Sequence, residues 1–165
     1  MELLDIYDNN GKRTGRTIER GNKTALLNEN EHIAVAAIFI ENHKGEFLIQ
    51  KTSKEKGGHY STTGGHVTTG ETPLETIKRE VKEELGIHIE NDKIEELGYL
   101  SFDKPLRYLY YLQKDIDINA LQIQKEEVES AQYMSVEKIN ELINTEKMLK
   151  SHGILFHELQ KKKKS

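Results

Sequence analysis

Three glutamates lie close together on one predicted helix, and their spacing suits metal chemistry. At about 100° per residue, Glu80, Glu83 and Glu84 fall on one flank of the helix predicted over residues 72–86. Two carboxylates about 5.5 Å apart repel by about 3 kcal/mol at an effective dielectric of 20. The lysines of the segment fall on the opposite flank and give Glu80 no balancing charge. A divalent cation would relieve the repulsion, because Mg²⁺ prefers carboxylate oxygens; a partner from elsewhere in the fold is the alternative.

The helix that carries these glutamates has clear signals at both ends. Thr72 is the expected N-cap, Pro73 occupies the first helical position, and Glu75 completes a capping box. Gly86 supplies the C-terminal stop. Before the helix, Gly64-Gly65 and Gly70 permit positive φ angles and close approach of the backbone to a ligand. A glycine-rich turn that leads into a helix can hold phosphates, but alone it is a weak signal.

Taken together, these residues match a longer pattern that resembles the Nudix box at every specified position. The pattern is glycine, glutamate six residues later, then arginine-glutamate, a glutamate pair and a closing glycine before an aliphatic residue. It is carried here by Gly65, Glu71, Arg79, Glu80, Val81, Glu83, Glu84, Gly86 and Ile87. Outside the box, "LLDIYDNNGKRTG", "LIQKTSKEK", "GGHVTTGE" and "EEVESAQYMSVEKI" are most similar to the branch of the superfamily that contains isopentenyl diphosphate isomerase.

The resemblance implies an α/β fold, with a mixed sheet between helices in an α/β/α sandwich and the box as loop-helix-loop. It implies a Mg²⁺-dependent hydrolase, with Mn²⁺ as an alternative cofactor, in which water attacks a phosphorus atom of a diphosphate. Glu80, Glu83 and Glu84 would be the metal ligands, and Glu83 and Glu84 would also serve catalysis. The structural residues of the box would be Gly65, Glu71, Arg79 and Gly86.

Two departures from the isomerase pattern bear on the reaction. The isomerases have a cysteine just before the Gly-His pair, where this chain has Gly64, and the chain contains no cysteine at all. They also have a glutamate pair in a later strand, whereas Leu106–Leu112 contains no acid. Isomerisation therefore remains as a disfavoured alternative. A ligand sensor without catalysis is a third hypothesis, and the intact glutamate cluster argues against it.

Candidate site residues also lie outside the box. Glu127, in "KEEVES", is the predicted general base or auxiliary ligand, with Glu126 as the next choice. Substrate phosphates could contact His66 and a group of basic residues, namely Lys51, Lys54 and Lys56. The alternatives are a solvated basic loop for the lysines, which the pattern favours, and packing under the loop or contact with metal for His66. The sequence does not name the group attached to the diphosphate: nucleoside diphosphate sugars, dinucleotides, oxidised nucleotides and isoprenoid diphosphates all remain open.

Composition sets the wider frame. The 165 residues suit one Nudix domain over residues 1–160 and a basic tail over residues 161–165. With 24 basic and 28 acidic residues mixed along the chain, the net charge of −4 gives no reason to expect a nucleic acid partner. The N-terminus lacks a basic segment followed by an apolar one, and the longest apolar run, Ile33–Ile40, is too short to span a bilayer. We therefore expect a cytoplasmic protein away from membranes; the oligomeric state stays open, with a homodimer as one option.

The remaining elements are predicted from periodicity and turn signals. Strands are expected over residues 3–7, 33–40, 46–51, 59–63, 94–102, 106–112 and 128–134. Helices are expected from Ser135 and over residues 148–160. Residues 17–30 are expected to be irregular or helical.

Overall fold

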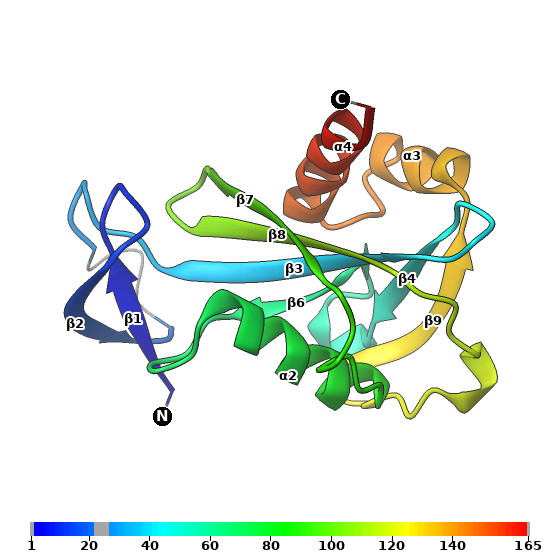
Figure 1. The fold of residues 1–165 in the computed structure, drawn as a ribbon, viewed down its shortest axis with the longest axis horizontal. Coiled ribbons are helices and arrows are strands. Elements are labelled where there is room, and N and C mark those ends of the chain that lie inside the picture. The colour runs from blue at the N-terminus through cyan, green and yellow to red at the C-terminus, as the bar shows by residue number, and fades with distance from the viewer. Residues whose placement is uncertain (1, 22–26, 165) are drawn as a thin grey trace.

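A central sheet lies between helices on its two faces in the computed structural model, which describes residues 2–21 and 27–164 (Figure 1). One face is covered by α2 (Pro73–Leu85) and the other by α3 (Val136–Asn144) and α4 (Lys150–Lys164). The predicted α/β fold, with a mixed sheet between helices, is confirmed. None of the described helices is long and apolar enough to cross a membrane.

The sheet is built around β3 (Ala34–Glu41). Its parallel neighbour is β8 (Leu106–Gln113), and β7 (Glu95–Ser101) extends the sheet beyond β8. On the other side β3 pairs with β6 (Thr63–His66) along its first half, but with β4 (Phe47–Thr52) only at its end. Strand β4 then pairs with β5 (Tyr60–Ser61) and β9 (Val128–Met134). Because β4 leaves β3 after one residue pair, β6 takes its place beside β3, and a hydrogen bond from Thr63 to Gln50 links β6 to β4.

Each face of the sheet has its own apolar core. Alternate residues of β3 point to opposite faces, as the period of a strand requires. Ile38 packs with Ile77 and Val81 of α2, whereas Phe39 packs with Phe156 of α4, their ring centroids 5.5 Å apart. The continuous apolar run Ile33–Ile40 therefore marks a strand that is covered on both sides, as expected from the sequence.

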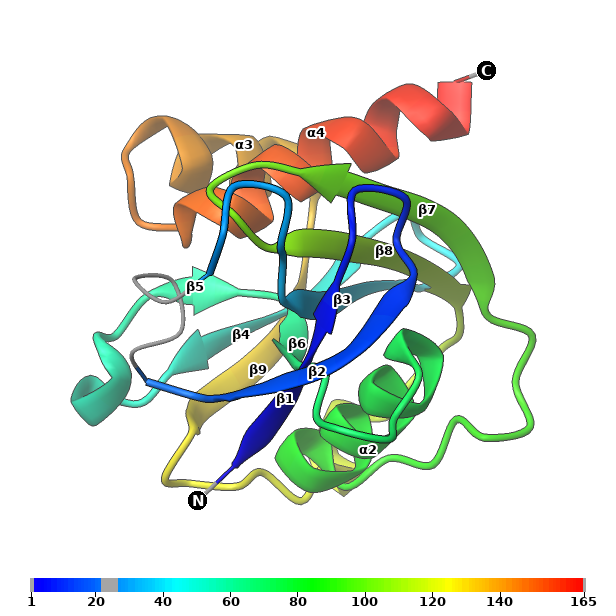
Figure 2. The same cartoon turned by 90° about the vertical axis from the view of Figure 1, so that its left-hand side faces the viewer.

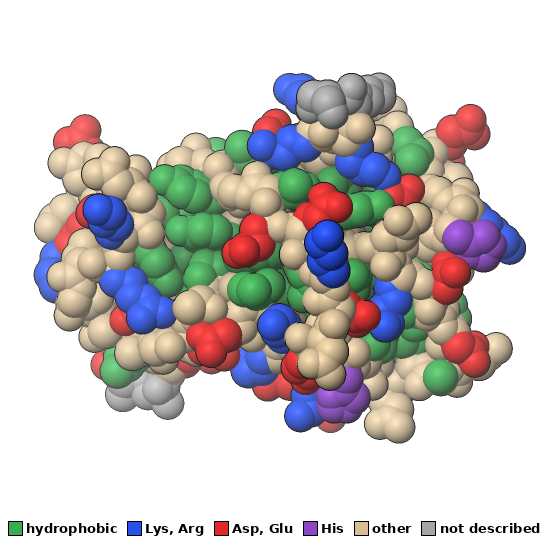
Figure 3. Space-filling view, viewed as in Figure 1, with side chains coloured by type: hydrophobic (Ala, Val, Ile, Leu, Met, Phe, Trp, Pro, Cys, Tyr) green, Lys and Arg blue, Asp and Glu red, His purple; other side chains and the backbone are tan. Residues whose placement is uncertain are grey.

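An N-terminal hairpin stands at one end of this sandwich (Figures 1 and 2). Its strands are β1 (Leu3–Tyr7) and β2 (Arg13–Glu19), paired antiparallel. The prediction of irregular or helical structure from residue 17 was wrong for residues 17–19, because pairing with β1 holds a mostly exposed polar segment as a strand; residues 22–26 lie outside the described residues. On the face shown in Figure 3, side chains of both charges are interspersed, and hydrophobic ones gather beside the hairpin.

Two further elements differ from the prediction. Gly64 and Gly65 were expected to follow a strand, but they lie inside β6 and pair with Ala37 and Ala36. The lysine run 161–164 was expected to be a tail, but it forms the last turn of α4. Lys163 forms an ion pair with Glu41 and lies over the Tyr111 ring, 4.9 Å from its centroid. These contacts with the sheet favour continuation of the helix.

Candidate active site

The helix α2 begins and ends as the sequence predicts. The Thr72 side chain accepts a hydrogen bond from the Glu75 backbone N–H at 3.1 Å, and the Glu75 carboxylate accepts one from the Thr72 N–H at 2.9 Å. Gly86 closes the helix at φ 70°, and a Cβ there would come within 2.7 Å of Gln122. The capping box and the positive φ of Gly86 are local features, and the contact with Gln122 adds a constraint from a distant segment; together they fix where the glutamates of this helix point.

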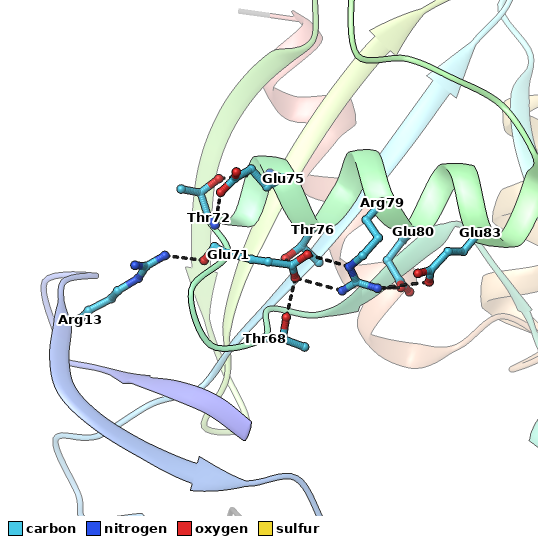
Figure 4. A network of polar contacts seen from close by, with 9 residues as sticks. All are labelled: Arg13, Thr68, Glu71, Thr72, Glu75, Thr76, Arg79, Glu80 and Glu83. Atoms are coloured by element: carbon cyan, nitrogen blue, oxygen red, sulfur yellow. Dashed lines mark hydrogen bonds and ion pairs between the residues drawn. The ribbon is translucent and has the colours of Figure 1, made fainter. Parts of the chain in front are cut away.

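Arg79 joins the loop before α2 to the acidic flank of the helix (Figure 4). Its guanidinium donates two hydrogen bonds to the Glu71 carboxylate, at 2.7 and 3.0 Å. It also contacts Glu80 at 2.7 Å and Glu83 at 3.2 Å. The expectation that Glu80 has no balancing cation on its own helix was therefore wrong, because the adjacent arginine bends back to it.

Glu71 is held at the centre of this network. Thr68 and Thr76 hydroxyls donate to its carboxylate at 2.7 and 2.9 Å, in addition to the two bonds from Arg79. These donors, with Arg79 foremost, lower the pKa of Glu71 to about 2. The carboxylate thus stays ionised and ties the loop at Thr68 to the second turn of α2. This geometry supports the structural role that the resemblance implied for Glu71 and Arg79.

Glu84, which is buried, and Glu80, which is half-buried, form a hydrogen-bonded pair of carboxyl groups. Only 8% of Glu84 is exposed, and burial raises the pKa of both groups, with the contact between the two carboxyls adding to the rise at Glu84. The Gln50 side-chain amide donates to Glu84 at 2.7 Å and in turn accepts a hydrogen bond from Thr63 at 2.9 Å. Without a cation, the pair therefore retains a proton at neutral pH, which replaces the like-charge repulsion expected from the sequence.

The two glycines of β6 are required by the close approach of neighbouring atoms, and not by positive φ angles. A Cβ on Gly65 would lie 2.3 Å from a carboxylate oxygen of Glu80, and one on Gly64 would lie 2.7 Å from the Ala36 carbonyl oxygen. Neither glycine has a positive φ, whereas Gly70 does, at 88°. Gly65 is therefore required by the close approach of α2 to β6, with Glu80 between them.

Glu127 comes from a distant loop and lines the same cavity as Glu80 and Glu84. Gln124 N–H donates to the Glu84 carbonyl at 3.0 Å, and Ser53 N–H donates to the Glu127 carbonyl at 3.0 Å, so the loop is tied both to α2 and to the end of β4. The Glu127 side chain lies 3.5 Å from Lys56. Its charge contributes to the raised pKa of Glu84. The neighbouring Glu126 is exposed and does not line this cavity.

The predicted basic residues separate into two groups. Lys56 and His66 line the cavity beside Glu84 and Glu127. Lys51 instead pairs with Glu129 at 3.5 Å, lies over Tyr60, and borders a different hollow. Lys54 is exposed and borders none of the described hollows. Lys51 and Lys54 therefore do not line this cavity in the described structure, because the strand register and the short turn after β4 direct them elsewhere.

The cavity has an acidic compartment and a second compartment that share a wall. The acidic compartment, about 290 Å³, is lined by Glu80, Glu83, Glu84 and Glu127 together with Arg79 and Gln124. The second, about 280 Å³, extends between β3, β8 and the first turn of α4. The residues that line both are Arg20, Lys56, Gly64, Gly65, His66, Glu84 and Glu127. A ligand can therefore reach from one compartment into the other.

The polar cavity residues that the sequence did not predict include Arg20, Gln50, Arg107 and His152. Arg107 had a signal, since it is the one charged residue in the apolar strand Leu106–Leu112. Arg20 comes from the hairpin, where it also pairs with Glu2 at 3.0 Å. Gln50 and His152 carry no pattern that would distinguish them from surface residues, because only the folding of β4 and α4 brings them to the cavity.

The acidic compartment fits a hard divalent cation. Within residues 2–21 and 27–164 no three His, Asp or Glu side chains converge as a preformed metal cage. Mg²⁺ usually binds through one or two carboxylates, completed by waters and substrate phosphates, rather than in an all-protein cage. Glu80 and Glu84 supply such a pair, and Glu83 and Glu127 line the same compartment. A buried pair with raised pKa values also gains from a cation that replaces its shared proton.

Comparison with known proteins identifies the family. The family model for the NUDIX domain matches residues 30–157. An uncharacterized Nudix hydrolase of Listeria monocytogenes is 34% identical over 86% of this chain and 85% of that protein. The mouse bis(5'-nucleosyl)-tetraphosphatase (asymmetrical) is 30% identical over 66% of this chain and 77% of that protein. The crystal structure of DR0079 from Deinococcus radiodurans superposes with a TM-score of 0.77 at 21% identity, covering 94% of this chain and 98% of that one.

The chain belongs to the Nudix family. It is therefore a hydrolase of the class that acts on diphosphate linkages, and members of this family generally use divalent cations. The superposition on DR0079 independently establishes the fold.

Proposed function

We propose that the protein is a Mg²⁺-dependent hydrolase that cleaves the diphosphate linkage of a nucleoside diphosphate derivative or a related organic diphosphate. The observation that carries the proposal is that Glu80, Glu83, Glu84 and Glu127 line one compartment. The similarity to a bis(5'-nucleosyl)-tetraphosphatase supports a substrate derived from nucleotides. Mg²⁺ is the expected ion, and Mn²⁺ is an alternative of similar ligand preference.

The bound ion would neutralise the phosphates and lower the pKa of the attacking water. Glu80 and Glu84 would hold it, with Glu83 beside them. Glu127 lies across the compartment from α2 on a loop of its own, so we assign it the role of general base that accepts the proton of that water. Lys56, 3.5 Å from Glu127, would contact a substrate phosphate from the shared wall.

A substrate panel tests this proposal. Purified protein with Mg²⁺ is incubated in H₂¹⁸O with nucleoside diphosphate sugars, dinucleoside polyphosphates, oxidised nucleoside diphosphates and isopentenyl diphosphate. We expect turnover that EDTA abolishes, with ¹⁸O in a phosphate of the product because water attacks phosphorus. Label in a sugar or prenyl carbon–oxygen bond would contradict attack at phosphorus. Mg²⁺-independent turnover would contradict the metal role.

The same panel addresses isomerisation. Moving a double bond requires a proton to be delivered to one carbon and removed from another. The chain has Gly64 in place of the cysteine of the isomerases, and β8 contains no acid. We expect no enzyme-dependent deuterium in isopentenyl diphosphate recovered from deuterated buffer. Incorporation above the enzyme-free control would restore the isomerase hypothesis.

A further inference from the structure

The second compartment of the cavity ends at two polar side chains that the acidic compartment does not touch. Arg107 of β8 and His152 of the first full turn of α4 line only this compartment. Arg107 lies beside Val35 in the parallel register of β3 and β8, and both line the cavity on the face that α4 covers. Residues 35, 107 and 152 come together only through the sheet and the packing of α4 on it.

Arg107 is a partly buried cation without a carboxylate partner among the described residues. Its Nε donates only a long hydrogen bond, 3.4 Å, to the Phe102 carbonyl, and the guanidinium lies 4.4 Å from the centroid of the Phe102 ring. Burial lowers its pKa, opposed by the charge of Asp103, but the group stays ionised at neutral pH. No hydrogen-bond partner is found among the described residues for the other N–H groups of the fork, and Arg107 lines the cavity.

His152 presents a second donor in a fixed tautomer. The Thr62 backbone N–H donates to Nδ1 at 3.1 Å, so Nδ1 carries no hydrogen and the neutral ring holds its proton on Nε2. Burial and then the charge of Arg107 lower the pKa of His152 to about 4, which keeps the ring neutral at pH 7. No acceptor for Nε2 is found in the part of the chain that the structure describes. The ring therefore offers Nε2–H to whatever occupies the cavity.

We infer that Arg107 and His152 form a receptor for an anionic group of the substrate, a phosphate or a carboxylate, located beyond the diphosphate that is cleaved. This inference rests on the proposed function for its orientation. The cleaved diphosphate lies with the acids in one compartment, and the distal anion meets a cation and a neutral donor in the other. A planar arginine fork suits phosphate and carboxylate oxygens.

The receptor sets a substrate class. A diphosphate whose other end is a hydrocarbon would leave the Arg107 charge desolvated and unpaired, which is costly. Isoprenoid diphosphates are therefore poor substrates, and diphosphates with a further phosphate or carboxylate on the second group are preferred. The volume of the compartment is about 280 Å³, close to the smallest ligand pockets, whose volumes begin at about 300 Å³. The distal group is therefore compact.

Binding of simple anions tests the receptor without any turnover. Inorganic phosphate and, in a separate arm, acetate are titrated into metal-free protein in EDTA at low ionic strength, followed by isothermal titration calorimetry. We expect the dissociation constant for at least one anion to rise at least about tenfold in Arg107→Met, because a charge-assisted fork is lost. The arm that responds identifies phosphate or carboxylate as the distal group.

Two controls make the result specific. Lys51→Met removes a partly buried lysine that lies outside both compartments and should bind the anion as wild type does. His152→Gln replaces the neutral ring with a neutral amide whose N–H donor lies in a different place. This variant should weaken anion binding less than Arg107→Met does. If Arg107→Met does not fold, as judged by circular dichroism and thermal melting, His152→Gln carries the same measurement.

Equal affinity of wild type, Arg107→Met and His152→Gln for both anions would overturn the inference, while leaving hydrolysis untouched. Conversely, failure of every diphosphate in the substrate panel would overturn the proposed function but not the EDTA binding result. Where a panel substrate with a distal anion is cleaved, Arg107→Met should raise KM at least about tenfold with kcat within twofold. Unchanged KM for that substrate would also count against the receptor.

Discussion

The two compartments of the cavity are built in different ways. The acidic one depends largely on 22 consecutive residues, from Gly65 to Gly86, in which a capping box, a loop-to-helix ion pair and a terminal glycine fix the glutamates locally. The other draws Arg107 and His152, which the acidic compartment lacks, from β8 and α4. A locally specified site keeps its chemistry through changes elsewhere, whereas a wall assembled from distant segments can change its selectivity without disturbing that chemistry.

The largest effect is expected at the buried pair. Glu84→Gln should lower kcat by about 10³-fold or more, because a charged metal ligand is lost. The metal-free protein should melt within about 2 °C of wild type, since glutamine resembles the protonated Glu84 and can still accept from Gln50. Mg²⁺ should raise the melting temperature of wild type more than that of the variant. Equal responses to Mg²⁺ together with wild-type turnover would refute the metal site.

Glu127 tests whether a residue outside the local motif takes part in the chemistry. Glu127→Gln should lower kcat by about 10²-fold, the lower range for loss of a general base, and should change KM little. Glu126→Gln is the matched control, because its side chain is exposed one residue away and outside the cavity. If both variants turn over at the same rate, the general base has been assigned to the wrong loop, and the contrast between compartments would be sharper than proposed.

Glu71 tests how far the acidic compartment depends on the loop-to-helix lock. Glu71→Gln removes the charge that accepts two hydrogen bonds from Arg79, and the free energy of unfolding should fall by about 1–3 kcal/mol. Because the freed Arg79 still contacts Glu80 and Glu83, activity should fall by about tenfold or less at temperatures well below the melt. Urea unfolding monitored by circular dichroism measures the free energy of unfolding, and the substrate panel measures the activity. Unchanged stability would mean that the network is not structural.

The smallest effect is expected for the contribution of His152 to the pH dependence of stability. Its folded pKa, about 4, lies below the unfolded value of 6.5, so between these values the unfolded chain binds a proton that the folded chain does not. The stability contribution is complete above pH 6.5 and declines as the pH falls toward 4. The ring is partly open to the cavity, which reduces the expected effect. On acidification, the free energy of unfolding of His152→Gln should therefore fall by about 1 kcal/mol less than that of wild type.

Urea unfolding of both proteins at pH 7.5, 6, 5 and 4.5 measures that difference. Glu84, Glu127 and His66 line the same cavity and are present in both proteins, so their contributions largely cancel when the curves are subtracted. Parallel curves for wild type and His152→Gln would show that His152 is not held neutral. In that case the second compartment would lack the fixed donor that distinguishes it from the acidic one.

The sequence by itself determined the features that depend on neighbours in the chain. The bounds of α2, its cap at Thr72, its stop at Gly86 and the shared flank of its glutamates follow from helix geometry and from side chains a few residues apart. The doubly covered strand β3 was also readable, because both of its faces are apolar. Together with the matched box, these features were enough to predict the family.

Only the tertiary structure decided which distant side chains share the cavity. Strand register brings Arg107 beside Val35 and directs Lys51 away, and α4 adds His152, which no local pattern marks. It also decided that burial raises the pKa of Glu80 and Glu84, and that Gly65 is needed because Glu80 lies against it. Burial, register and contact between segments far apart are properties of packing, and one-dimensional spacing carries no measure of them.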